Sequence, residues 1–243
     1  MKKRHSVALA GICAGAFCVT THAQTPIING QPATTMPAQT YYSYRSHAYV
    51  GADVGGTIPR DLNVKEFFGS VPAGTKVHLD PGFRLDFVGG YQLTDWFSVE
   101  GETGIMANKI DSITGADIHG WASVDNVPLL ANVRLQLPMH KCPVTPYIGG
   151  GAGGSVSVID FQDNIDFNGA SGNGSAASLV FAYQAFGGLR WAISDNMGIG
   201  VAYHYFVTTG SDWKFDTFGT TTDHMKFSGG AMHAVSVAFD YHF

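Results

Sequence analysis

The sequence predicts an all-β fold, a transmembrane antiparallel up-and-down β-barrel of eight strands. Three observations predict it: segments of about ten residues alternate between apolar and polar side chains, the connections between them are alternately short and long, and the chain begins like an exported protein. The composition agrees, because only 14% of the 243 residues are charged and 31 are glycine. Such a chain is unusual for a water-soluble enzyme, and its length suits one domain.

The N-terminus predicts export. Three basic residues lie within residues 1–4, and an apolar run follows over residues 7–19. This run is too short for a membrane-spanning helix, which needs about 20 residues, and Thr21 and Ala23 are small residues at the positions that precede a signal-peptidase cut. We therefore expect a signal peptide over residues 1–23, cleaved after Ala23, with an uncleaved anchor as the alternative.

The remainder of the chain is expected to form a tail and a barrel. Residues 24–40 are uncharged and contain three prolines, which predicts a flexible periplasmic N-terminal tail over residues 24–45. Residues 46–243 then form the barrel. The 14 Lys and Arg residues against 19 Asp and Glu residues give a net charge of −5, which excludes a nucleic-acid-binding surface.

Eight segments of the barrel region alternate strictly between apolar and polar residues. In the clearest of them, Phe83 and Phe87 share one face while Arg84 and Asp86 lie on the other. No stretch beyond the signal is apolar for about 20 residues, so the mature chain would cross a membrane as strands rather than as a helix. The expected strands cover residues 47–56, 83–93, 97–105, 129–137, 147–158, 181–191, 199–205 and 235–243.

Alternation by itself leaves two arrangements open, a soluble ligand-carrying barrel with an apolar core and a membrane barrel with its apolar side chains outside. The polar face favours the membrane barrel, because it is rich in Gly, Ala and Ser with a few charges, as suits a narrow interior. Aromatic residues also gather towards the segment ends, where two interfacial girdles would lie. These residues are Tyr91, Trp96, Phe97, Trp191, Tyr203, Tyr205, Tyr241 and Phe243.

The connections between segments are a third feature that favours the membrane barrel. Short connections rich in turn-forming residues lie around residues 94–95, 138–144 and 194–196. Long connections cover about residues 57–80, 107–121, 159–178 and 207–228. This alternation is typical of an outer-membrane barrel, with short turns in the periplasm and long loops outside the cell.

Four motifs carry a resemblance to a known family: residues 49–55 (YVGADVG), 146–151 (PYIGGG), 188–191 (GLRW) and 235–243. Together they resemble the small eight-stranded outer-membrane β-barrels, similar to the OmpA transmembrane domain and the opacity-type surface proteins. The resemblance covers about residues 46–243 and implies integral insertion in the outer membrane of a Gram-negative cell. The last motif looks like the terminal assembly signal of that family, formed by Val235, Val237, Phe239, Tyr241 and Phe243.

Charged residues are expected inside the barrel. They are Asp53, Arg84, Asp86, Glu100, Glu102, Arg134, Arg190 and Asp240. Counted from the short turns, Glu100, Arg134, Arg190 and Asp240 form one layer near the periplasmic end, and the other four form a higher, looser set. Eight strands enclose an interior that side chains fill, so we expect an internal salt-bridge plug. A gated narrow ion path lined by the same residues is the alternative.

No catalytic, metal-binding or cofactor-binding residues are expected. Some barrels of this size resemble lipid-modifying enzymes, and the nearest candidates here are His224, Ser228 and His233, which lack the tight His-x-Ser spacing of the lipid A deacylases. One loop contains oxygen-rich residues that either hold a divalent cation or form a solvated acidic loop, without the EF-hand spacing. These are Asp160, Asp163, Asn164, Asp166 and Asn168.

The expected function is a non-catalytic one, with a structural or surface-interaction role in adhesion or membrane integrity through the extracellular loops. A narrow ion or small-solute channel and a lipid-modifying enzyme are the alternatives. Expected partners are outer-membrane lipid and lipopolysaccharide, bridged by divalent ions because the loops are acidic, the outer-membrane assembly machinery, and a surface protein partner. Loop aromatics either contact that partner or pack the loops on the rim. They are Phe67, Phe68, Trp121, Trp213 and Phe218.

Overall fold

The computed structural model divides the chain into two compact units, Met1–Thr40 and Tyr41–Phe243. In the first unit, β1 (Ile27–Ile28) pairs antiparallel with β2 (Gln31–Pro32). The expected signal peptide and most of the expected tail lie outside the described residues. The structure describes residues 27–28, 31–32, 48–67, 74–114, 117–118, 121–139, 142–167, 170–214 and 224–243.

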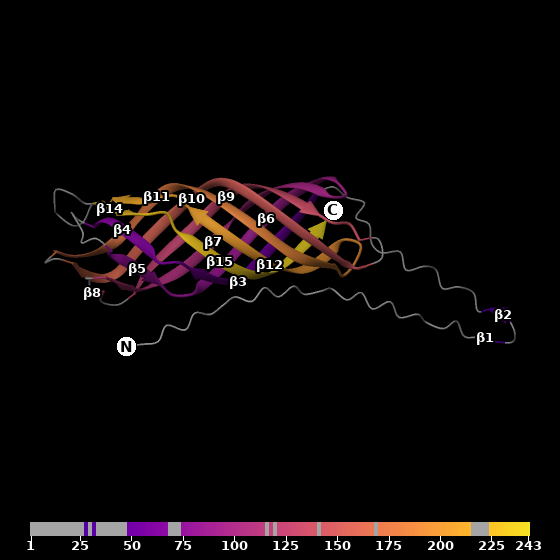
Figure 1. Cartoon of the computed structure of the whole chain (residues 1–243), viewed down its shortest axis with the longest axis horizontal. Helices are drawn as coiled ribbons and strands as arrows, with labels where there is room; N and C mark the ends of the chain where they lie inside the picture. Colours follow the sequence, from indigo (N-terminus) through magenta and orange to yellow (C-terminus); the bar gives the residue numbers. More distant parts are fainter. Residues whose placement is uncertain are drawn as a thin grey trace. The chain divides into compact units, whose positions relative to one another are not determined.

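Eight long strands of the second unit form a closed antiparallel ring (Figure 1). Each strand pairs with the next in chain order, and the last pairs with the first, so that every strand has two neighbours. The strands are β3 (Ala48–Pro59), β6 (Gly82–Thr94), β7 (Phe97–Ile113), β9 (Ala122–Gln136), β10 (Val144–Phe167), β11 (Ala170–Ala192), β12 (Met197–Thr208) and β15 (Ala231–His242). Each of the eight expected segments lies on one of these strands, which confirms the predicted fold class.

Apolar side chains cover the outside of the ring. Leu129 and Leu179 are 71% and 79% exposed, whereas Arg84 and Asp86 on the inner face are fully buried. This orientation suits a barrel surrounded by lipid, and it excludes the soluble barrel with an apolar core. No helix that is long and apolar enough to cross a membrane occurs in the part of the chain that the structure describes.

Glycines on the inner face make room for large side chains from neighbouring strands. A Cβ on Gly90 would overlap the ring of Tyr49, and one on Gly149 would overlap the ring of Phe186. Because the ring of an eight-stranded barrel is narrow, a large residue on one strand needs a small one beside it. The glycines on the polar face of the sequence therefore provide the space that these large inward side chains occupy.

The strands continue beyond their expected ends on the extracellular side. The expected loop over residues 159–178 is wrong, because β10 and β11 pair there as a hairpin, from Ile159 with Ala176 to Phe167 with Ala170. Shorter strands pair in and around the other connections. They are β4 (Leu62–Phe67), β5 (Lys76–Leu79), β8 (Asp117–Ile118), β13 (Asp212–Lys214) and β14 (His224–Phe227).

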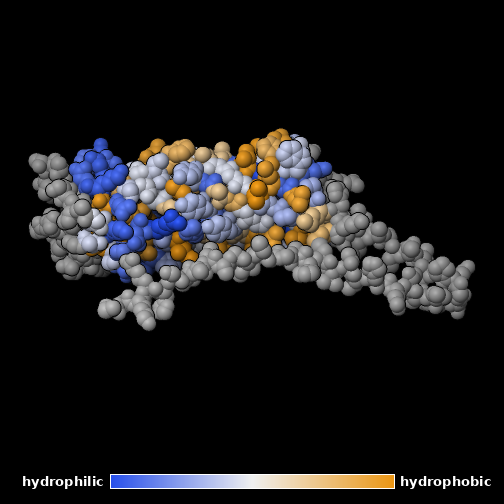
Figure 2. Space-filling model, in the orientation of Figure 1, coloured by the Kyte–Doolittle hydropathy of each residue, from blue (hydrophilic) through white to orange (hydrophobic). Residues whose placement is uncertain are grey.

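These shorter strands and the outer ends of β7, β9, β10 and β11 form a region that we call the extension. Its interior is apolar, whereas polar residues such as Lys65 and Lys214 face outward. The space-filling view shows hydrophilic residues gathered at the end that carries β4 and β14 and hydrophobic residues over the ring (Figure 2). The apolar core of the extension contains Leu62, Val64, Val77, Ile110, Ile113, Ala122, Val124, Ile159, Phe161, Ala176, Trp213, Met225 and Phe227.

Candidate functional site

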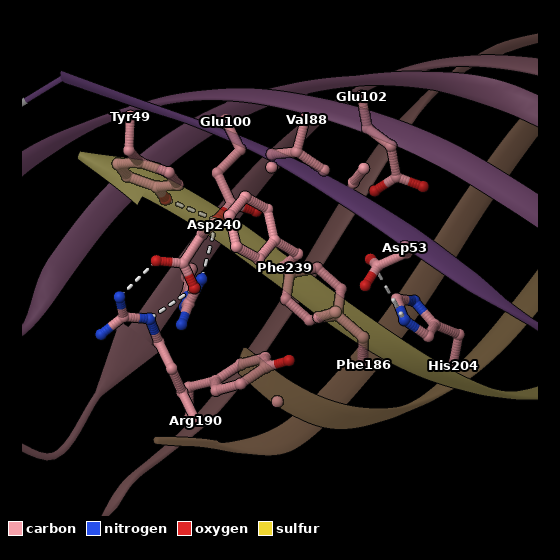
Figure 3. Close-up of a pocket in the computed structure, with 16 residues that line it drawn as sticks. Tyr49, Asp53, Val88, Glu100, Glu102, Phe186, Arg190, His204, Phe239 and Asp240 are labelled. Atoms are coloured by element: carbon pink, nitrogen blue, oxygen red, sulfur yellow. Dashed lines mark hydrogen bonds and ion pairs between the residues drawn. The ribbon is translucent and has the colours of Figure 1, made fainter. Parts of the chain in front are cut away.

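The lumen of the ring contains the buried Arg, Asp and Glu side chains of the described residues. All eight charged residues expected inside the barrel face it, and they divide into two lower clusters and one upper cluster, with Asp53 apart. The lower clusters lie towards the end with the short turns. Figure 3 shows their members Tyr49, Glu100, Arg190 and Asp240, which come from β3, β7, β11 and β15.

Glu100 is the centre of the first lower cluster. Its Oε1 accepts a hydrogen bond of 2.5 Å from the Tyr49 hydroxyl and lies 3.5 Å from Nη1 of Arg134. The Arg134 guanidinium also lies over the Tyr147 ring, 3.9 Å from its centroid, in a cation–π arrangement. The carboxylate is therefore neutralised by one arginine and oriented by one phenol.

Asp240 is the centre of the second lower cluster. Arg190 donates to both of its oxygens, with a distance of 2.6 Å from Nε to Oδ1, in the bidentate geometry that suits arginine and carboxylate. His242 places Nε2 3.2 Å from Oδ2 of Asp240 and stacks on Tyr49 with ring centroids 4.9 Å apart. Tyr49 and His242 thus join the two lower clusters into one layer.

The upper cluster is built on Arg84, which is fully buried. Its Nε donates to Asp86, and its Nη2 donates to Oε1 of Glu102 at 2.7 Å. The other oxygen of Glu102 accepts from Asn132 at 2.6 Å and from Gln184 at 2.5 Å. The expectation of a looser upper set is wrong for these three charges, because the amide side chains of Asn132 and Gln184 add hydrogen bonds to Glu102.

Asp53 lies outside these clusters. Its Oδ2 is 3.9 Å from Nε2 of His204, which in turn lies 3.3 Å from the Ser236 hydroxyl. Oδ1 of Asp53 has no hydrogen-bond partner among the described residues. A cavity of about 50 Å³ adjoins Asp53 and reaches Glu100, Arg190 and other lumenal residues, which is room for a few water molecules.

An apolar layer closes the lumen above the charged clusters. It consists of Met106, Leu130, Ala182, Phe206 and Met232, all of them buried. Above it lies a polar layer in which Asn108 donates to the Thr57 hydroxyl at 2.8 Å, beside a second cavity of about 20 Å³. The apolar core of the extension follows. A solute that entered the lumen would therefore meet the charged clusters, the apolar layer, the polar layer and then the apolar core of the extension.

The residues named as candidates for catalysis each have another partner. His224 places Nδ1 3.0 Å from Oδ1 of Asp212, the Ser228 hydroxyl accepts from the backbone N–H of Asn63, and His233 is hydrogen-bonded to a tyrosine. Within the described residues, no group of three or more His, Cys, Asp or Glu side chains could hold a metal ion. The acidic loop side chains beyond Asp160 lie outside the described residues.

Two of the five loop aromatics are described fully enough to place. Trp213 is buried in the core of the extension, where its indole N–H donates to the Ser157 carbonyl at 2.8 Å, so it packs the rim. Trp121 is half exposed, with Lys109 over its ring. The side chains of Phe67, Phe68 and Phe218 lie outside the described residues. Of the expected assembly signal, all five side chains lie on the outer face and are exposed: Val235, Val237, Phe239, Tyr241 and Phe243.

The lumen also uses residues that the sequence did not single out. Tyr49, Asn132 and Gln184 donate hydrogen bonds to the charged groups, and Nε2 of His204 lies 3.9 Å from Oδ2 of Asp53. Tyr49, Asn132 and Gln184 each lie an even number of residues from a charged residue on the same strand. His204 lies on the polar face of its segment. The signal for them was the alternation itself, extended from charged to neutral polar side chains.

Comparison with known proteins agrees with this architecture. The structure is similar to OprG of Pseudomonas aeruginosa, with a TM-score of 0.53 and 16% sequence identity over 82% of this chain and 98% of that one. It also matches Neisserial surface protein A (TM-score 0.47, 15% identity, 81% and 97% covered) and the attachment invasion locus protein Ail of Yersinia pestis (TM-score 0.37, 17% identity, 79% and 99% covered).

A search of curated protein sequences gave no match. The model of the outer membrane protein beta-barrel domain, however, matches residues 30–243. The ring of eight strands, its apolar outer face and this match agree. The chain belongs to the outer membrane protein β-barrel domain family and is an integral protein of the outer membrane.

Proposed function

We propose that this protein is a sealed, non-catalytic outer-membrane barrel that acts through its extracellular extension, in surface contact or in the integrity of the membrane. The observation that carries the proposal is the closure of the lumen. Charged clusters, the apolar layer around Phe206 and the core of the extension follow one another along the axis. A channel of this width would need a continuous polar path.

The extension supports the second half of the proposal. Because β10 and β11 pair as far as Phe167 and Ala170, the connection between them is a built hairpin rather than a loose loop. Its core is apolar and its outer face is polar, so it is folded as a soluble protein would be. A rigid surface of this kind suits binding, since less conformational entropy is lost when a partner is bound.

Planar-bilayer recording of the purified protein tests the sealed lumen. We expect no reproducible conductance steps from the wild type, because ions would have to cross the apolar layer. Phe206→Ser, which places a small polar residue in that layer, serves as the opened comparison. Reproducible steps from the wild type that change in Arg84→Gln would establish a channel instead.

A shortened barrel tests the role of the extension. Ile159 pairs with Ala176, so residues 160–175 can be replaced by Asn-Gly, which forms a two-residue hairpin turn. Cells that lack the protein are complemented with the wild type or with the shortened form, and permeability to detergent and surface attachment are measured. Attachment lost with permeability restored indicates a surface role; both restored by the shortened form indicates that the barrel alone is sufficient.

We also propose that the five outward residues at the C-terminus are recognised by the outer-membrane assembly machinery. They form an uninterrupted apolar face on β15, ending in Phe243. Phe243→Ala tests this by the amount of heat-modifiable protein in the outer membrane, with Val54→Ala on β3 as the matched control. Equal amounts from both variants would rule out a special role for the terminal residue.

A further inference from the structure

A cluster of polar and aromatic side chains interrupts the apolar outer face near the extracellular end of β12, β15 and β3. The Tyr203 hydroxyl lies 2.6 Å from Nδ1 of His233, and the rings of Tyr205 and His233 have centroids 5.0 Å apart. The Arg60 guanidinium lies over Tyr205, 5.9 Å from the ring centroid. We call these four residues the rim cluster.

The rim cluster lies at the level of the outer lipid headgroups. His233 is about ten residues from Phe243 along the direction of β15. At about 3.3 Å per residue and a strand tilt of about 40°, the two residues are about 25 Å apart along the membrane normal. Since the apolar band of such barrels is about 25 Å tall and the short turns lie at the Phe243 end, His233 lies at the outer interface.

The charge around the rim cluster favours an anion. The outward faces of β3, β12 and β15 carry no carboxylate, and Arg60 forms no ion pair among the described residues. The adjacent Asp61 instead lies 3.0 Å from Nδ1 of His78. This contrasts with the acidic connections elsewhere on the extracellular side, which repel anions.

The donors of the rim cluster fit a phosphate group. When the Tyr203 hydroxyl donates to Nδ1 of His233, the imidazole proton is on Nε2, which is then free to donate to a third group. Arg60 offers a planar pair of N–H groups, the geometry that binds phosphate oxygens in a bidentate way. The ring of Tyr205 lies beside both donors, and aromatic rings of this kind prefer the headgroup region.

We propose that the rim cluster binds a phosphate group on the headgroup of an outer-leaflet lipid. Arg60 and His233 would hold the phosphate, Tyr203 would orient the imidazole, and the apolar faces below would contact the acyl chains. The site is separate from the lumen and from the extension, so it does not depend on the proposed function. It supplies a direct contact with lipid phosphate where the acidic loops would need a bridging cation.

Native mass spectrometry of the full chain in maltoside micelles tests the site. The probes are phosphorylated lipid A, the same lipid after dephosphorylation, and inorganic phosphate. We expect one phosphorylated lipid per protein, held about tenfold more tightly than the dephosphorylated lipid, which corresponds to about 1.4 kcal/mol. Inorganic phosphate that binds as tightly, and by the same residues, would overturn the assignment to a lipid.

Two variants and one control decide between the rim cluster and a general attraction to anions. Arg60→Gln is expected to weaken binding about tenfold, and Tyr203→Phe to weaken it by a smaller factor while leaving both donors present. Lys109→Gln is the control, because Lys109 also lies over an exposed aromatic ring, that of Trp121, but without the Tyr–His pair. Equal losses in Arg60→Gln and Lys109→Gln, with heat-modifiable migration retained, would overturn the proposal.

Discussion

The lumen and the extension share β7, β9, β10 and β11, yet their interiors are opposite in character. The lumen around Arg84 is filled with ion pairs and amides, whereas the interior of the extension around Trp213 is filled with apolar side chains. The outer surface changes in the opposite direction, from apolar to polar. Along β10 and β11, strand pairing passes through both regions, with a register shift between Phe161 and Ile165.

The difference follows from what surrounds the wall. Outside the extension there is water, so apolar side chains gain free energy by turning inward. Around the ring there is lipid, which accepts apolar side chains at no cost, so the narrow interior is left to polar groups that must satisfy one another. Packing therefore stabilises the extension through burial of apolar surface, and the lumen through ion pairs and hydrogen bonds.

Removal of Arg84 is expected to have the largest effect. Arg84→Ala leaves Asp86 and Glu102 buried without their cation, at a cost of about 3–5 kcal/mol. The free energy of unfolding in urea, measured for protein folded into phospholipid vesicles, checks this. The triple variant Arg84→Met with Asp86→Asn and Glu102→Gln should recover most of the loss; an Arg84→Ala variant as stable as the wild type would show that the cluster is not essential.

Truncation of Trp213 should destabilise the extension without destabilising the ring. Trp213→Ala removes the largest buried side chain of the extension, and changes of this kind cost about 3–5 kcal/mol in well-packed cores. We expect faster hydrogen exchange and proteolysis at β13, β14 and β4, with no change in the heat-modifiable migration of the ring. Loss of the ring as well would mean that the two regions fold as one cooperative unit.

Tyr49→Phe should have a smaller effect confined to the lumen. The variant removes the hydroxyl that donates to Glu100, and a hydrogen bond to a charged group contributes about 1.5–3 kcal/mol. Arg134 remains beside the carboxylate, so we expect a loss at the lower end of this range in the same urea assay. Tyr183→Phe, a change of an exposed tyrosine on the outer face, is the matched control and should be neutral.

The pair between Lys226 and Glu66 on the outside of the extension should have the smallest effect. Its atoms lie 2.8 Å apart, and both side chains are partly exposed to water, so water and salt screen it. The hydrogen bond to Glu66 raises the pKa of Lys226 above its ordinary value. Its contribution is therefore complete below that ordinary value and disappears as the pH rises through the raised pKa.

The test of that pair is a pH series. Lys226→Gln should be as stable as the wild type at high pH and at high salt, and a small difference should appear only at neutral pH and low salt. If no difference appears, the pair is one of the surface ion pairs that contribute nothing measurable to stability. A large loss at neutral pH and high salt would show that Lys226 contributes by packing rather than by charge.

Much of the ring could be predicted from the sequence because its alternation of apolar and polar residues is uninterrupted. Phe83, Phe87 and Leu129 were expected outside and lie there. The ion-pair partners could not be predicted, since strand register and tilt decide which charges meet across the lumen. Counting from the turns placed Arg84 inside and in one set with Glu102, but it did not identify the ion pair between them.

The extension was missed for a specific reason. Val158 faces outward and the next residue, Ile159, faces inward, and the same adjacent apolar pair occurs at Ile105 and Met106. On β10, alternation continues beyond Val158 and Ile159 with its phase reversed, so the apolar positions change from those that face lipid to those that face the core. If a single phase of apolar–polar alternation is expected along a strand, this reversal looks like the end of the strand.

The hairpin of β10 and β11 sets how far this protein stands out from the cell. From Ile159 to Phe167, at about 3.3 Å per residue and the tilt of the ring, the hairpin rises about 20 Å. Cells with short surface saccharides would leave the top of the hairpin accessible to antibodies or other cells, and cells with long saccharides would cover it.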